Sequence, residues 1–189
     1  MLSDRDIWIA MNPATMMPPN RRHLAPLRIV PLGDDDPIQP ASVDLRLGDE
    51  FIYWKVIADP ETGKPIRVKR KVNALKFLWK PGAFVLATTL EYVEIPDWLC
   101  AKIDGKSTLG RQGITAHITA GLIDPGFKGM ITLEMKNIGY ESVTLHTGQS
   151  VCQLELHKLS SPAQRPYGHE SRKSKYQFQV GVQEARGVA

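Results

Sequence analysis

The sequence predicts an all-β fold, a sandwich or barrel of the jelly-roll type, with one short helix at the N-terminus. From residue 41 onward, short runs rich in β-branched and aromatic residues recur along the chain. Turn residues separate them, including Pro81-Gly82, Pro125-Gly126 and Thr147-Gly148. Many short strands at regular spacing, with little helix, are typical of this class of fold.

The N-terminal helix is predicted within residues 1–12. Ser3 can cap it, and acidic residues occupy the first turn, where the helix dipole favours them. Prolines 13, 18 and 19 should end it. Residues 11–40 are then expected to form a long loop with one short apolar piece, residues 27–32. Three consecutive acids, residues 34–36, cannot all face one ion from a regular element, so we expect a turn before Pro37 and not a metal site.

Alternation identifies the first strands. Apolar and charged residues alternate in Val43-Asp-Leu-Arg-Leu47, the pattern of a half-buried strand, and residues 50–57 are rich in aromatic and β-branched residues. The tail, residues 162–189, is polar and contains glycines, so it is either a loose end or an arm that orders over a ligand. One domain over residues 1–189 is predicted. Further strands are expected at residues 84–90, 131–135, 143–146 and 151–156.

Composition is that of an ordinary globular protein, with 42% hydrophobic and 23% charged residues in 189. No apolar run is long enough to cross a bilayer, and the first residues do not resemble a signal peptide, so we expect a cytoplasmic protein with no membrane contact. Cys100 and Cys152 lie in apolar runs and not in a paired motif. Buried, reduced thiols are therefore expected, with no disulfide and no zinc.

The net charge of +4 is unevenly distributed. Residues 64–80 and 165–175 are basic, and such patches bind nucleic acid or a polyphosphate. The first run is predicted to be a solvated loop, although alternating valines also fit an exposed strand. No recognition helix or RNA-binding aromatic motif is present, so we do not expect nucleic acid as a partner. Trp54, Trp79 and Trp98 are expected in the core or at an interface.

Three local features carry the chemistry. Asp104-Gly-Lys-Ser-Thr-Leu-Gly-Arg111 combines glycines, hydroxyls and cations that suit an anion, without Walker A spacing. Asp124 lies between apolar residues and a Pro-Gly turn, where capping the turn is its ordinary role. Glu134 is the one acidic residue of an apolar strand. Residues 131, 133 and 135 should face one side of that strand, which leaves Thr132 and Glu134 on the other.

Together these features resemble the dCTP deaminases and their dUTPase relatives. The resemblance runs from Leu2-Ser-Asp-Arg-Asp6 through Gln39-Pro-Ala-Ser-Val-Asp-Leu-Arg-Leu-Gly48, and it is dense from residue 105 to residue 181. The tail adds Arg165-Pro-Tyr-Gly168 and Ser174-Lys-Tyr-Gln-Phe-Gln-Val-Gly181, similar to the closing arm of the deaminase branch. The resemblance implies a dUTPase-like distorted jelly-roll barrel with an ordered C-terminal arm (162–189) that closes over the nucleotide. It also implies a homotrimer with active sites between subunits.

The resemblance further implies a hydrolase that converts dCTP to dUTP and ammonia and supplies dUMP for thymidylate synthesis. Glu134 would be the catalytic acid and base, Ser107 would hold the water, and Arg111 would orient the site. Asp124 would accept the sugar 3′-hydroxyl, and the backbone of residues 132–134 would read the base. Magnesium would arrive with the triphosphate, and no protein metal ligands or zinc are expected. The implied substrate-binding residues are Lys106, Ser107, Thr108, Leu109, Gly110, Arg111, Asp124, Thr132, Leu133, Glu134, Gln153, Tyr167, Lys175 and Gln179.

The segment Thr119-Ala-Gly-Leu-Ile-Asp124, together with Lys106, is similar to the bifunctional members, which also hydrolyse the dUTP product to dUMP and diphosphate. A small residue at position 121 is expected to leave room for a second water. Simple deamination stays open beside this reading. So do two alternatives: a plain dUTPase, which needs no glutamate at position 134, and a nucleotide-binding regulator without turnover. His117 is expected to be structural.

Overall fold

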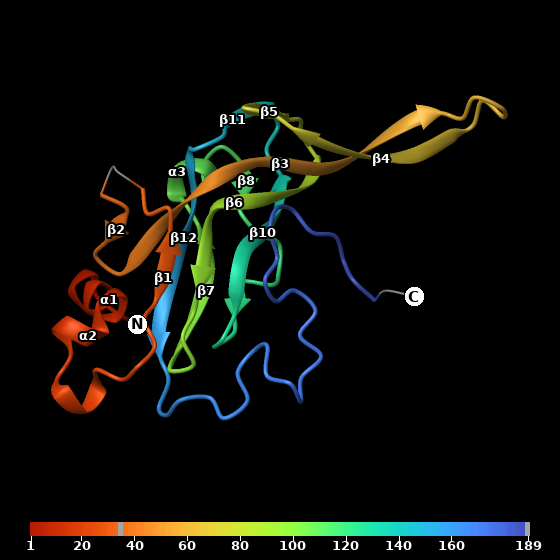
Figure 1. The fold of residues 1–189 in the computed structure, drawn as a ribbon. Coiled ribbons are helices and arrows are strands. Elements are labelled where there is room, and N and C mark those ends of the chain that lie inside the picture. Colours follow the sequence, from red (N-terminus) through yellow and green to blue (C-terminus); the bar gives the residue numbers. More distant parts are fainter. Residues whose placement is uncertain (34–35, 188–189) are drawn as a thin grey trace.

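The computed structural model describes residues 1–33 and 36–187, and it consists mainly of antiparallel strands (Figure 1). The predicted all-β class with a short N-terminal helix is therefore confirmed. No helix in the described part of the chain is long and apolar enough to cross a membrane. The elements are α1 (Asp4–Met11), α2 (Pro13–Met16), η1 (Pro19–Arg21), β1 (Arg28–Val30), β2 (Ile38–Gln39), β3 (Ser42–Ala58), β4 (Pro65–Asn73), β5 (Lys76–Trp79), β6 (Phe84–Glu94), β7 (Leu99–Gly105), α3 (Ser107–Gly110), β8 (Ile114–Thr115), β9 (Leu122–Ile123), β10 (Lys128–Asn137), β11 (Val143–His146) and β12 (Ser150–Lys158).

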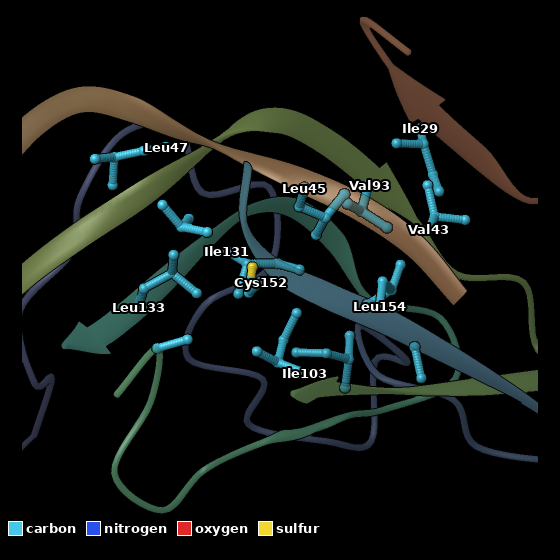
Figure 2. Packing of buried hydrophobic residues seen from close by; sticks show 14 of the residues in the cluster. Ile29, Val43, Leu45, Leu47, Val93, Ile103, Ile131, Leu133, Cys152 and Leu154 are labelled. Atoms are coloured by element: carbon cyan, nitrogen blue, oxygen red, sulfur yellow. The ribbon is translucent and has the colours of Figure 1, made fainter. Parts of the chain in front are cut away.

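The main sheet runs in the order β8-β10-β6-β3-β12-β7-β9 and curls around one hydrophobic core. Strands β1, β2 and β4 pair beside this path, and β5 and β11 form a separate pair. Figure 2 shows Ile131 and Leu133 of β10 pointing into the same core as Cys152 and Leu154 of β12. Because the sheet curls, strands far apart in its order supply opposite walls of the core. The result is a distorted barrel.

The first two predicted strands are one continuous strand, β3. Its pairing with β6 shifts register between Leu47 and Phe51. Gly48 lies in this irregularity, where a Cβ atom would come within 2.7 Å of Thr88 Cγ2 and 3.1 Å of the Thr88 carbonyl oxygen. The glycine therefore permits a close crossing of two strands and does not end the strand.

The basic run at residues 64–80 is not the predicted loop; the alternative of an exposed strand was the correct one. Residues 65–73 form β4, which pairs with β3 over its whole length, and residues 76–79 form β5. The outer part of the β3–β4 hairpin extends away from the barrel (Figure 1). Val68 and Val72 alternate with exposed cations, so the strand satisfies its backbone while its charges stay in water.

The N-terminal region also differs in part from expectation. The Ser3 hydroxyl accepts a hydrogen bond from the Asp6 N–H at 3.3 Å, which confirms the predicted cap of α1. Pro13 follows the end of α1 and begins α2, because proline fits the first position of a helix. The expected long loop of residues 11–40 thus contains α2, η1, β1 and β2. The turn predicted at residues 34–36 involves Asp34 and Asp35, which lie outside the described residues.

Residues after β12 form an arm that returns to β10. Gln179 makes a parallel bridge with Gly129, the Met130 N–H donates to the Gln179 carbonyl at 3.0 Å, and the Phe178 N–H donates to the Lys128 carbonyl at 2.7 Å. The Gln179 side chain is itself buried. The arm is therefore ordered against residues 128–130 at the start of β10, and the predicted ordered arm is present.

Asn137, at the end of β10, provides a test of the fold. Its buried side chain donates to the carbonyls of Trp79 at 2.9 Å and Glu141 at 2.7 Å, and it accepts from the Gly139 N–H at 2.9 Å. Asn137→Ala should lower the free energy of unfolding by about 2–4 kcal/mol, because buried backbone groups lose their partners. Urea denaturation measures this. Asn73→Ala, which removes one exposed hydrogen bond, is the control and should cost under about 1 kcal/mol; equal losses would contradict the assignment.

Candidate functional site

Glu134 is held on the outer side of β10 by the residues beside it in the strand. Leu133 and Met135 are buried in the core, with 1% and 0% of their surface exposed. Since side chains alternate along a strand, Thr132 and Glu134 must point the other way. Both line a cavity on that side, which we call the Glu134 cavity. The predicted division of β10 into two faces is therefore confirmed.

The Glu134 cavity has a volume of about 620 Å³, within the range of small-molecule sites. The residues around it come from strands β3, β6 and β10, the Asp124 segment and the C-terminal arm. Polar side chains alternate with apolar and aromatic walls around it, which is the composition of a site that orients a ligand. Its lining comprises Trp54, Phe84, Leu86, Ala120, Leu122, Ile123, Asp124, Phe127, Ile131, Thr132, Glu134, Tyr167, Tyr176, Gln179, Gln183, Glu184 and Ala185.

A second cavity, the Ser107 cavity, has a volume of about 360 Å³ and surrounds the start of α3. Ser107 and Gly110 belong to this single helical turn, and Lys106 precedes it. Thr108 and Arg111 are exposed beside the cavity, whereas the Leu109 side chain lies in the core. Leu109 can therefore offer a ligand only its backbone. The lining comprises Asp104, Gly105, Lys106, Ser107, Gly110, Ile114, Thr115, Ala116 and His117.

The structure divides the predicted site residues between these two cavities. Asp124, Glu134, Thr132, Tyr167 and Gln179 line the first, and Lys106, Ser107 and Gly110 line the second. No residue lines both cavities. Within one described chain, the proposed acid–base residue and the proposed water-holding residue thus belong to different cavities.

Gln153 and Lys175 line neither cavity. Gln153 lies on β12 directly opposite Asp44 of β3 and Asp104 of β7, so it occupies the centre of a polar row across three strands. The Lys175 ammonium donates to the Arg186 carbonyl at 3.1 Å. It must turn away from this carbonyl to reach a ligand elsewhere.

Asp44 is a site residue that the sequence did not single out. Its carboxylate forms an ion pair with the Lys106 ammonium, and its Oδ1 atom is buried without a hydrogen-bond partner among the described residues. An anion that binds Lys106 must compete with this carboxylate or add to it. The alternation of residues 43–47 indicates that Asp44 faces outward. It does not predict the ion pair with Lys106, which comes from a distant part of the chain.

Trp54 is the second addition. Its ring stacks on Phe84 at a centroid distance of 5.7 Å, and the Arg67 guanidinium lies 4.9 Å from its centroid. Of the three tryptophans predicted in the core or at an interface, Trp79 and Trp98 lie in the core and Trp54 forms an aromatic wall of the Glu134 cavity. Sequence patterns do not distinguish a core tryptophan from one that lines a cavity.

One ion pair joins the β3–β4 hairpin to the arm, a second lies within the hairpin, and neither was predicted. Lys69 contacts Glu184 at 2.8 Å, and Lys71 contacts Glu50 at 2.8 Å. Glu50 accepts a hydrogen bond from the Val182 N–H at 3.3 Å. A Cβ atom at position 181 would lie 2.6 Å from the Glu50 carboxylate oxygens, so Gly181, with φ of 69°, permits this contact. Cations of the basic run therefore help to fasten the arm.

Gly121 lies close to the His117 ring and to the backbone of Ile103. A Cβ atom at this position would lie 3.0 Å from His117 Cε1 and 3.1 Å from the Ile103 carbonyl oxygen. The His117 Nδ1 atom is buried without a hydrogen-bond partner in the described part of the chain. Gly121 thus accommodates the His117 ring, and the expected room for a second water stays a prediction.

Fold and cavities define an all-β protein with a polar, nucleotide-sized site at the outer face of a curled sheet. A crystal structure of 2′-deoxycytidine 5′-triphosphate deaminase from Agrobacterium tumefaciens has a similar fold, with a TM-score of 0.61 at 20% identity. The match covers 84% of this chain and 48% of that longer chain.

The chain belongs to the dCTP deaminase-like family, whose model matches residues 20–159. A protein of Methanobrevibacter smithii named dCTP deaminase, dUMP-forming is 47% identical over 166 residues, or 84% of this chain and 86% of that protein. A protein of Halorubrum lacusprofundi named dCTP deaminase is 47% identical over 169 residues, or 85% of this chain and 83% of that protein. The family resemblance inferred from the motifs is confirmed.

Cys152, in the core behind the Lys106–Asp44 pair, predicts a pH dependence of stability. Burial raises the pKa of its thiol, the charges of Glu91 and Asp44 raise it further, and Lys106 opposes them. Above a pH of about 8.5 this thiol is ionised in the unfolded chain and stays protonated in the folded chain. The contribution of the thiol to stability is therefore intact below that pH and falls by about 1.4 kcal/mol per pH unit above it.

Urea denaturation of the wild type and Cys152→Ala at pH of about 8 and about 10 tests this contribution. The stability difference between the two proteins should shrink at the higher pH. Cys100 is present in both proteins, so its ionisation cancels. A difference that stays constant would show that the Cys152 thiol ionises equally in the folded and unfolded states.

Proposed function

We infer that this protein is a hydrolase that removes ammonia from dCTP. The observation that carries this inference is the position of Glu134, which is half-buried in a nucleotide-sized cavity together with Asp124 and Thr132. The relatives named dCTP deaminase support the substrate. Family membership supports the reaction class.

In the proposed reaction, Glu134 takes a proton from a water that attacks C4 of cytosine. The carboxyl delivers this proton to N3. It then takes the second proton from the new C4 hydroxyl and passes it to the amino group, so that the C4–N bond breaks and a C4 carbonyl and ammonia are formed. A partly desolvated carboxylate suits both steps, because its affinity for a proton lies closer to the working pH. The C-terminal arm, residues 162–189, would close over the nucleotide and limit access of bulk water.

Ser107 and Arg111 would come from a neighbouring subunit of a homotrimer. Support comes from the separation of the two cavities, since Ser107 and Glu134 do not line a common cavity within one chain. An interface that brings one subunit's Ser107 cavity to the next subunit's Glu134 cavity would complete the site. Ser107 would hold the attacking water, and Arg111 would orient it beside the base.

The triphosphate would bind with its magnesium ion as one substrate. Lys106 supplies a cation at the Ser107 cavity, and Tyr167 and Gln179 supply donors at the Glu134 cavity. Gln153 and Lys175 would join them after small movements, and Asp124 would accept the 3′-hydroxyl. Because dCTP is made and used inside cells, we propose a cytoplasmic protein of one domain.

We further propose that the product is dUMP. The segment Thr119-Ala-Gly-Leu-Ile-Asp124 supports this, as does the Methanobrevibacter smithii relative named as dUMP-forming. Water would attack the α-phosphorus of bound dUTP and release diphosphate, with Asp124 available to position the nucleotide. This product would enter thymidylate synthesis.

Product analysis tests the proposed function. Incubation of the protein with dCTP and magnesium should release ammonia, dUMP and diphosphate without accumulating dUTP. Glu134→Gln should reduce ammonia release by about 10²–10⁴-fold, because it removes the acid–base group. Glu155→Gln, on the other side of the barrel, is the control. Unchanged ammonia release in Glu134→Gln would contradict the mechanism, and accumulating dUTP would contradict the dUMP-forming reaction.

Mixing two inactive variants tests the site between subunits. Ser107→Ala and Glu134→Gln should each be inactive alone. Refolded together in equal amounts, they should recover about a quarter of the wild-type activity. In randomly mixed trimers, about a quarter of the subunit interfaces bring an intact Ser107 of one subunit to an intact Glu134 of the next. Ammonia release per milligram of mixed protein is the measurement. Absence of recovery would mean that both side chains act from the same subunit.

A further inference from the structure

Arg186, near the end of the C-terminal arm, makes several contacts with other residues of the arm. Its backbone N–H donates to the Tyr176 hydroxyl at 3.0 Å, and its carbonyl accepts from the Lys175 ammonium at 3.1 Å. Its guanidinium donates through Nη1 to the Lys175 carbonyl at 2.7 Å and lies 5.6 Å from the centroid of the Tyr176 ring. These contacts close residues 175–186 into a loop.

The same guanidinium fixes one side chain of the Glu134 cavity. Arg186 Nη2 donates to Gln183 Oε1 at 2.7 Å, while Gln183 Nε2 donates to the Val180 carbonyl at 3.1 Å. A cation beside Oε1 forces the oxygen of the amide to face Arg186, so the orientation of the amide is set. The Gln183 backbone N–H also donates to Thr132 Oγ1 at 3.1 Å, which places the residue directly against β10.

We propose that Arg186 is a positioning residue for the reaction, which acts by holding Gln183 against β10 in the Glu134 cavity. The proposal rests on the proposed function. It assigns Arg186 no contact with substrate. Arg186 instead keeps the closed arm in one conformation, so that the arm is already ordered when substrate binds.

Arginine suits this role because its planar guanidinium donates in two directions at once. The two acceptors, the Lys175 carbonyl and the Gln183 amide, lie on separate parts of the arm, and one rigid group joins them. A lysine in the same place would keep the charge without this fork. The Arg186 side chain is exposed and outside the core, so its removal should loosen the arm and leave the barrel intact.

Kinetics of Arg186→Ala test the proposal. KM for dCTP should rise about tenfold, because the variant must order the arm on binding, while the melting temperature should change by less than about 2 °C. Arg186→Lys should resemble Arg186→Ala. Arg28→Ala is the control, since the exposed Arg28 side chain of β1 makes no hydrogen bond or ion pair with the described residues, and it should behave as the wild type.

A double-variant comparison separates positioning from a general structural role. In a Gln183→Ala background, Arg186→Ala should raise KM by less than about twofold, because the group through which it acts is already gone. Two effects that multiply would overturn the proposal. So would a fall in melting temperature that accompanies and accounts for the loss of activity.

Hydrogen exchange of the nucleotide-free protein provides a measurement that does not depend on the reaction. The Gln183 backbone N–H should exchange at least about tenfold faster in Arg186→Ala than in Arg28→Ala, because its hydrogen bond to Thr132 Oγ1 opens more often. Equal exchange would overturn the inference even if the protein deaminates dCTP. Absence of turnover in the wild type would contradict the proposed function and leave this exchange result to decide the role of Arg186.

Discussion

Strand β10 has to satisfy two environments at once, and the candidate site depends on this constraint. Leu133 and Met135 anchor the strand in the core, and this burial turns Thr132 and Glu134 outward. A slip of one residue would exchange the two faces, placing a carboxylate in the core and a leucine in the cavity. The burial of Leu133 and Met135, which stabilises the barrel, therefore also fixes the direction in which Glu134 points.

The arm completes this outer face. It contributes Gln179, Gln183 and Glu184 to the cavity and is fastened by contacts of several kinds. Backbone bonds to β10 hold Gln179, burial of Val182 holds the middle of the arm, and the hairpin cation Lys69 contacts Glu184. Exposed ion pairs are individually weak, so the arm depends on their combination with burial and backbone pairing. Such a segment can be ordered and still open.

The separation of the Glu134 and Ser107 cavities gives the proposed homotrimer a chemical reason. A single chain holds an acid–base group in one cavity and a hydroxyl with cations in the other. If neighbouring copies join these cavities, assembly itself creates the site, and an isolated chain has no complete one. The Lys106–Asp44 pair partly neutralises the cation of the Ser107 cavity.

The sequence by itself determined the all-β class, the capped N-terminal helix and the outward position of Glu134, because each follows from a local pattern of period or capping. Its motifs also determined the family. Tertiary structure alone decided that residues 43–57 are one strand and that the basic run forms a hairpin. It also decided that Asp44 pairs with Lys106, that Trp54 lines the Glu134 cavity and that Arg186 contacts Gln183. These features depend on contacts between segments far apart in the chain, for example between Lys106 and Asp44 or between Lys69 and Glu184. No local periodicity records such contacts, because the free energy that selects them comes from packing and charge pairing in the folded protein.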